Sequence, residues 1–140
     1  MLTVLRHPWR TARLLWEMGI SGDRVMNMVS GSYATELMED LSDWQRNGTG
    51  EVALRLADTA HRARLEVRDN LEHIERGSST RTTVEVQAYE ASLTRLEAVM
   101  RSSAIAPGEQ LKDETRMAAL SFLEARGRLA QLLTRRGRRL

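Results

Sequence analysis

Residues 51–76 place an apolar side chain at every third or fourth position for about seven helical turns. The positions are Val52, Leu56, Ala60, Ala63, Val67, Leu71 and Ile74. This spacing keeps all of them on one face of an α-helix. A helix of about 39 Å with one apolar face must bury that face against other helices. The segment therefore predicts a bundle of long helices.

Three other segments share this periodicity, and a shorter one precedes them. We predict helices over 8–18, 23–46, 51–76, 82–104 and 108–134. The apolar rows of the other long segments are Val25, Val29, Tyr33, Leu37, Leu41 and Trp44; Val86, Tyr89, Leu93, Leu96 and Met100; and Leu111, Ala118, Phe122, Ala125, Leu129 and Leu132, with Thr115 as a polar member. The links between the long segments are short, which favours antiparallel neighbours. We expect a single all-α domain, an up-down antiparallel bundle of four long helices with a short amphipathic N-terminal helix.

Local signals set the expected helix ends. Pro8 suits a first helical position, and Thr82 with Glu85 three residues later matches a capping box. Gly31 could break or kink the helix over 23–46, and the sequence leaves this open. The last helix is expected to end at 134, and an Arg-rich tail, 135–140, is expected to extend beyond its packed part, with Gly137 as a break.

Composition excludes several classes of protein. The 140 residues suit one domain. The chain contains no cysteine, so disulfides and Cys-ligated metals are excluded. No apolar run approaches the roughly 20 residues of a membrane span, and arginines interrupt the N-terminal apolar stretch that a signal peptide would need. We expect the protein in the cytoplasm or within a particle assembled there.

Charge is distributed unevenly along the chain. The first 13 residues carry a net charge of +3, and the last 15 carry +6. Because the whole chain has a net charge of +2, residues 14–125 carry −7. Lys112 is the only lysine. An acidic body with basic ends favours contacts between copies or with other macromolecules.

Catalytic and metal-binding patterns are weak. The sequence has no nucleophile elbow and no phosphate-binding loop of the Walker type. Di-metal helical bundles use two Glu-x-x-His motifs, and the nearest match here is a single Asp58-x-x-His61. We expect no enzyme activity, no cofactor, no metal and no small-molecule substrate.

The helix over 51–76 carries a second group of residues besides its main stripe. Leu54, Ala57, His61 and Leu65 are placed opposite that stripe on a helical wheel. Two interpretations remain: scattered exposed apolar residues, or a second interface. Charged residues are spaced for i,i+4 pairs, Glu51 with Arg55 and Asp58 with Arg62.

The N-terminal segment is amphipathic. Trp9 and Trp16 share a face, with Arg10 and Arg13 beside it. Such a helix could pack on the bundle, dock on a partner protein, or lie on an anionic membrane, where Trp and Arg suit the interface. The membrane is the least favoured of the three.

The C-terminal arginines, Arg135, Arg136, Arg138 and Arg139, raise the question of a partner. Arg clusters bind phosphate, which indicates nucleic acid. The acidic body and the lack of aromatics among these arginines favour a protein surface instead. A solvated terminus without a partner is the third interpretation.

The turn WQRNG, residues 44–48, resembles the turn of small secreted WXG-type hairpins in part only. Three residues separate Trp44 from Gly48, where that motif has one. No function is transferred from that family. We expect a non-enzymatic helical assembly protein, a subunit of a homo-oligomer or larger multi-protein particle. A nucleic-acid-associated protein is the alternative, and a metal- or small-molecule-binding bundle is the third.

Overall fold

The computed structural model describes residues 26, 29–30, 33–77, 80–106 and 109–139. Side chains within these ranges are described except at 71–77, 80, 109–111 and 134–139. All regular secondary structure in this part of the chain is α-helical. The predicted helix over 8–18 lies outside the described residues, and so do Gly31 and the question of a break there.

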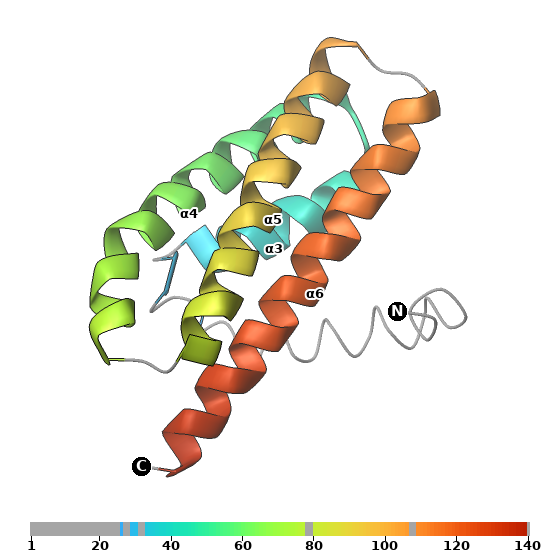
Figure 1. Ribbon diagram of the computed structural model, residues 1–140. Helices are drawn as coiled ribbons and strands as arrows, with labels where there is room; N and C mark the ends of the chain where they lie inside the picture. The colour runs from blue at the N-terminus through green and yellow to red at the C-terminus, as the bar shows by residue number, and fades with distance from the viewer. Residues whose placement is uncertain (1–25, 27–28, 31–32, 78–79, 107–108, 140) are drawn as a thin grey trace.

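Four helices pack against one another in the described ranges (Figure 1). They are α3, Tyr33–Arg46; α4, Gly50–Gly77; α5, Thr80–Ile105; and α6, Glu109–Arg139. Met26, Val29 and Ser30 are also helical, within the segment predicted over 23–46. None of the described helices is long and apolar enough to cross a membrane.

The start of α4 follows from its cap. The Thr49 hydroxyl accepts a hydrogen bond from the Val52 amide at 3.3 Å, and the Thr49 carbonyl accepts one from the Ala53 amide at 3.0 Å. Both bonds satisfy amides that the first helical turn leaves without partners. The helix therefore begins one residue before the predicted position 51.

The start of α5 differs from the prediction. The helix begins at Thr80, so Thr82 lies inside its first turn and is fully buried rather than capping it. Glu85, the other half of the expected capping box, pairs with Arg128 of α6 at 3.3 Å. The Glu85 carboxylate therefore pairs with α6 instead of making the local capping-box bond that the sequence predicted.

The end of α6 also differs. The helix continues through Gly137 to Arg139, so Gly137 does not break it and the predicted end at 134 is too early. The physical reason is local. Arginine is a strong helix former, and positive charge near a helix C-terminus interacts favourably with the helix dipole. These effects offset the cost of one glycine, about 1 kcal/mol.

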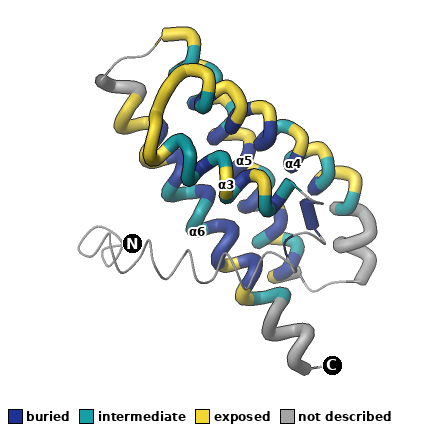
Figure 2. Tube along the Cα trace, turned by 180° about the vertical axis from the view of Figure 1, so that it is seen from behind, coloured by how far each residue is buried: buried dark blue, intermediate teal, exposed yellow. Residues whose placement is uncertain are grey.

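The core lies where the apolar rows of the four helices meet. Figure 2 shows buried positions recurring along each helix, and α3 running between α4 and α6 on the far side from α5. All five predicted core residues of α5 are fully buried: Val86, Tyr89, Leu93, Leu96 and Met100. The rings of Tyr89 and Phe122 pack with centroids 5.9 Å apart. Small residues of α4, such as Ala60 and Ala63, allow close approach of its neighbours.

Among the described side chains, more salt bridges join neighbouring helices than join turns of one helix. Arg55 pairs with Asp40 at 3.1 Å and Asp43 at 2.7 Å on α3, instead of the predicted Glu51. Asp58 pairs with Arg101 of α5 at 3.1 Å, instead of the predicted Arg62. The packed neighbours offer charges within reach, and an exposed i,i+4 pair contributes only about 0.3–0.5 kcal/mol.

Candidate partner-binding surfaces

A groove separates α3 from α6. Helix α4 packs on both α3 and α5, and α5 packs on α6, but α3 and α6 make no comparable contact. The space left between them has a volume of about 470 Å³. Its lining residues are Trp44, Gln45, Gly48, Ser103, Lys112, Thr115, Arg116, Ala119, Leu120 and Leu123.

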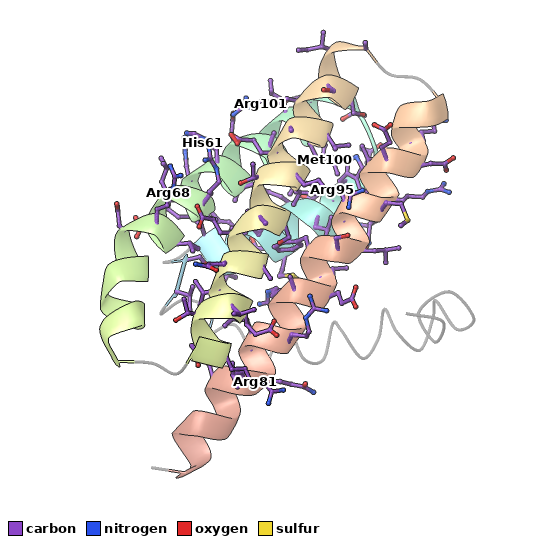
Figure 3. All side chains as sticks on the ribbon, in the orientation of Figure 1. His61, Arg68, Arg81, Arg95, Met100 and Arg101 are labelled. Atoms are coloured by element: carbon purple, nitrogen blue, oxygen red, sulfur yellow. The ribbon has the colours of Figure 1, made fainter. Side chains whose placement is uncertain are left out.

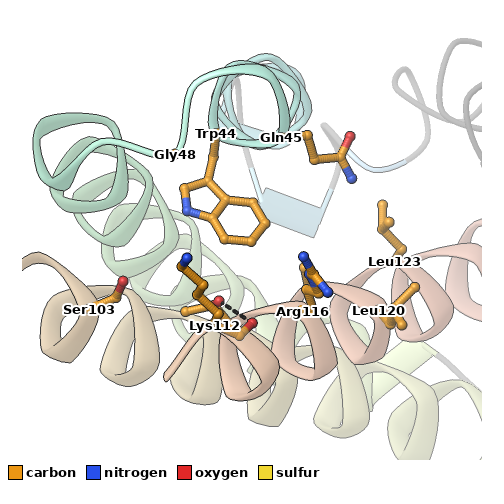
Figure 4. Close-up of a pocket in the computed structure, with 10 residues that line it drawn as sticks. Trp44, Gln45, Gly48, Ser103, Lys112, Arg116, Leu120 and Leu123 are labelled. Atoms are coloured by element: carbon orange, nitrogen blue, oxygen red, sulfur yellow. Dashed lines mark hydrogen bonds between the residues drawn. The ribbon is translucent and has the colours of Figure 1, made fainter. Parts of the chain in front are cut away.

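The groove has an apolar floor and a basic wall. The Trp44 indole projects from the end of α3, and Leu120 and Leu123 project from α6 (Figure 4). Lys112 and Arg116 lie one turn apart on the α6 wall, and both are exposed. Among the residues that line the groove there is no Asp or Glu. This combination suits a partner that is apolar and acidic.

The floor is held by the bundle. Trp44 and Leu123 are half-buried and pack against the core, beside the buried Ala119. The Thr115 hydroxyl donates to the Lys112 carbonyl at 2.8 Å within α6. An apolar surface fixed on rigid helices needs little reordering when a partner binds.

The outer face of α4 is the second surface. Leu54 and Leu65 are each 45% exposed, so the structure leaves these two predicted contact residues open to solvent. Glu51, Asp58 and Asp69 are exposed on the same side of the helix. We call Glu51, Leu54, Asp58, Leu65 and Asp69 the α4 stripe. The charge of this side of the helix is mixed, because the exposed Arg55 and Arg62 lie three or four residues from Glu51, Asp58 and Leu65 on the same face.

Two residues predicted for this face lie elsewhere. Ala57 is fully buried in the core, which corrects its placement opposite the main stripe. His61 lies at the seam with α5, where its Nδ1 is 2.7 Å from Glu97 Oε1. The helical wheel placed both residues away from the main apolar stripe of α4. The face of α4 that packs against α5 is wider than that stripe.

His61 belongs to a charged cluster along this seam. Glu97 also lies 3.4 Å from Arg64 and 3.5 Å from Arg101. Figure 3 shows His61, Arg68 and Arg101 following one another along the border of α4 and α5. Arg68 pairs with Glu90 at 3.1 Å. The cluster joins two helices around one partly buried carboxylate, so it serves packing.

The basic ends are described only in part. Trp9, Arg10, Arg13 and Trp16 lie outside the described residues. Arg135, Arg136, Arg138 and Arg139 belong to the last turns of α6. In Figure 1 this end of α6 extends past the start of α5.

The described residues contain no group of three or more His, Asp or Glu that could hold a metal ion. Sequence reasoning missed the groove. Trp44 falls in the periodic apolar row of its helix, as a core residue does. The α6 wall contributes only two cations, which is too few to stand out in the sequence. The signal available was Lys112, the single lysine, one turn before Arg116.

Comparisons of the chain with models of protein families, with curated proteins and with solved structures gave no significant match.

Proposed function

We propose that the protein is a non-enzymatic helical module that assembles with other protein subunits, either copies of itself or components of a larger particle. The groove between α3 and α6 carries this proposal, since it combines a fixed apolar floor with the basic pair Lys112 and Arg116. The basic termini would add contacts, as the charge distribution suggests.

The finer architecture belongs to the same proposal. Between α4 and α5 the ion pairs join Asp58 to Arg101 and Arg68 to Glu90, so residue numbers rise along one helix as they fall along the other. Such pairs support an up-down antiparallel arrangement. The short amphipathic helix over 8–18 and the cytoplasmic location stay predictions.

The native size of the protein tests the proposed function. Extract from the source cells is fractionated by size, and the protein is detected with an antibody. We expect it in fractions well above its own 15.9 kDa. Elution as a free monomer, both in extract and after purification at high concentration, would contradict the proposal.

Nucleic acid is the second candidate because four arginines occupy the last turns of α6. A mobility-shift assay with duplex DNA and with single-stranded RNA tests it. Binding that weakens steeply with salt and disappears when residues 135–140 are deleted would favour this candidate. Binding unchanged by the deletion would exclude the arginines as its source.

A further inference from the structure

We propose that the groove between α3 and α6 binds an acidic amphipathic helix of a different protein subunit. The inference rests on the proposed function and names the chemistry of the partner. Three properties of the groove carry it: the charges on its wall, the few hydrogen-bonding groups on its floor, and its length along α6.

No acidic residue of the lining neutralises the cations on the groove wall. Lys112 and Arg116 are exposed, and no Asp or Glu lines the groove with them. Arginines at the helix seams, such as Arg55 and Arg68, pair with carboxylates of the same chain. Arg116 forms no ion pair with the described part of the chain. An anionic partner would therefore supply an interaction that this part of the chain does not.

Two acidic residues lie between these cations in sequence but outside the groove. Glu114 is about 160° around α6 from both Lys112 and Arg116, so it lies on the opposite side of the helix. Asp113 is exposed and does not line the groove. It forms no ion pair with Arg116, which lies one turn further along the helix. The wall that faces the groove therefore presents positive charge.

The floor is apolar and has few groups that could pair with a peptide backbone (Figure 4). The Thr115 hydroxyl already donates to the Lys112 carbonyl, which leaves Gln45 and Ser103 as the polar side chains. All regular secondary structure in the described part of the chain is helical, so this part offers no strand edge. An extended peptide would leave its backbone amides and carbonyls without partners on this floor, whereas a helix pairs most of them internally. The floor therefore favours a helix.

The length of the groove matches about three turns of such a helix. Its lining residues on α6 run from Lys112 to Leu123, a rise of about 16 Å. Carboxylates four residues apart on a partner helix repeat every 6 Å or about one turn, as Lys112 and Arg116 do. Apolar residues at positions i, i+3 or i+4, and i+7 would lie on the floor, which is the spacing by which amphipathic helices bind grooves.

The described helices of a second copy fit the groove less well. The α4 stripe, with its exposed Leu54 and Leu65, shares its side of the helix with the exposed Arg62. Among the described side chains, Val84 of α5 and Met117 of α6 have no second exposed large apolar residue within two turns of the same helix. The inference therefore commits to a helix of a different subunit.

Synthetic peptides stand for the partner helix in the test. The acidic amphipathic peptide has about 14 residues, about 21 Å as a helix, with leucines on one face and glutamates beside them. A basic counterpart carries lysine at each glutamate, and a scrambled peptide keeps the acidic composition without the leucine face. Fluorescence anisotropy of labelled peptides, titrated with the full chain, measures each Kd. The acidic amphipathic peptide should bind at least about tenfold more tightly than either of the others.

Charge reversals in the chain locate the binding. The groove variant carries Arg116→Glu, alone or together with Lys112→Glu. Arg62→Glu is the matched control, because Arg62 is also exposed and without an ion pair to the described part of the chain, but lies on α4 and not in the groove. These exposed positions should tolerate the changes, and circular dichroism melts verify that every variant folds.

The double variant should bind the acidic peptide about tenfold more weakly or worse, and Arg116→Glu alone about threefold more weakly. The double variant should also bind the basic peptide more tightly than the unmodified chain does, because the charges of wall and peptide are then both reversed. Arg62→Glu should leave the Kd of the acidic peptide within about twofold.

Other results overturn the inference. If no peptide binds, if the scrambled peptide binds as tightly, or if Arg62→Glu weakens binding as much as Arg116→Glu, the groove does not recognise an acidic amphipathic helix. If the unmodified chain self-associates and the acidic peptide dissociates it, the occupant is a second copy. If dodecanoate binds the groove more tightly than the peptide and displaces it, the groove is a pocket for a small amphipathic acid. The proposed function is decided separately by the native size in extract.

Discussion

Trp44 of α3 lies on the apolar floor of the groove, and Arg116 of α6 lies on its basic wall. Trp44 is half-buried and packs against the core, whereas Arg116 is exposed. One residue therefore supports the fold as well as the groove, and the other can be changed with little effect on folding.

Trp44→Ala should lower the free energy of unfolding by about 1.5–2.5 kcal/mol, roughly half the cost of truncating a fully buried Trp. Arg116→Ala should stay within about 0.5 kcal/mol of the unmodified chain. Urea unfolding followed by circular dichroism measures both. Equal effects of the two substitutions would show that Trp44 does not pack as described.

Glu97 at the seam of α4 and α5 offers a second comparison. Its side chain is 13% exposed and lies near His61, Arg64 and Arg101, so Glu97→Gln should cost about 1–2 kcal/mol. Glu90→Gln is the control. Glu90 pairs with an Arg68 that is 65% exposed, and its loss should cost less than about 1 kcal/mol. Urea unfolding at neutral pH and fixed salt gives both values, and a larger cost at Glu90 would refute the assignment.

Phe122 packs against Tyr89 with the two rings tilted by 34°, and it is fully buried. Phe122→Ala should destabilise the protein by about 3–5 kcal/mol, since it leaves a cavity that rigid helices cannot close. Phe122→Leu should cost about 1.5 kcal/mol or less. Thermal and urea unfolding measure the difference. A cost below about 1 kcal/mol for the alanine variant would place Phe122 outside the core.

The core could be predicted because its signal is periodic. The rows through Leu37, Leu56 and Leu129 follow one face of each helix, and all three residues are buried. Helix ends were harder to predict. Thr82 and Gly137 are local signals, and tertiary packing and neighbouring arginines overrode them.

The candidate surfaces were predictable only in part. Leu54 and Leu65 follow from the helical wheel of one segment, and both are exposed. The groove depends on the spacing of α3 from α6, two helices that are distant in sequence. The periodicity of one helix does not show which of the neighbouring helices leave a gap between them. The sequence pattern therefore predicted only that Trp44 is a core residue.

The last turns of α6 give a fourth prediction. In the purified protein, Cα chemical shifts of residues 135–138 should be helical, and Gly137→Ala should strengthen them because alanine gains about 1 kcal/mol over glycine in a helix. Random-coil shifts from position 135 onward would contradict the helical end and agree with the tail that the sequence predicted.

A photo-crosslinking amino acid placed at Leu120, inside the groove, tests the central claim most directly. Equal amounts of unlabelled and ¹⁵N-labelled chains are mixed, so that mass spectrometry separates crosslinks between copies from those within one copy. The account predicts crosslinks from position 120 to a second protein chain, seen as mixed-label products when the partner is another copy and as larger products in extract when it is a different subunit. It predicts none from the same amino acid at Val84. No crosslink from position 120 to any other protein chain, in the purified mixture or in extract, would contradict it.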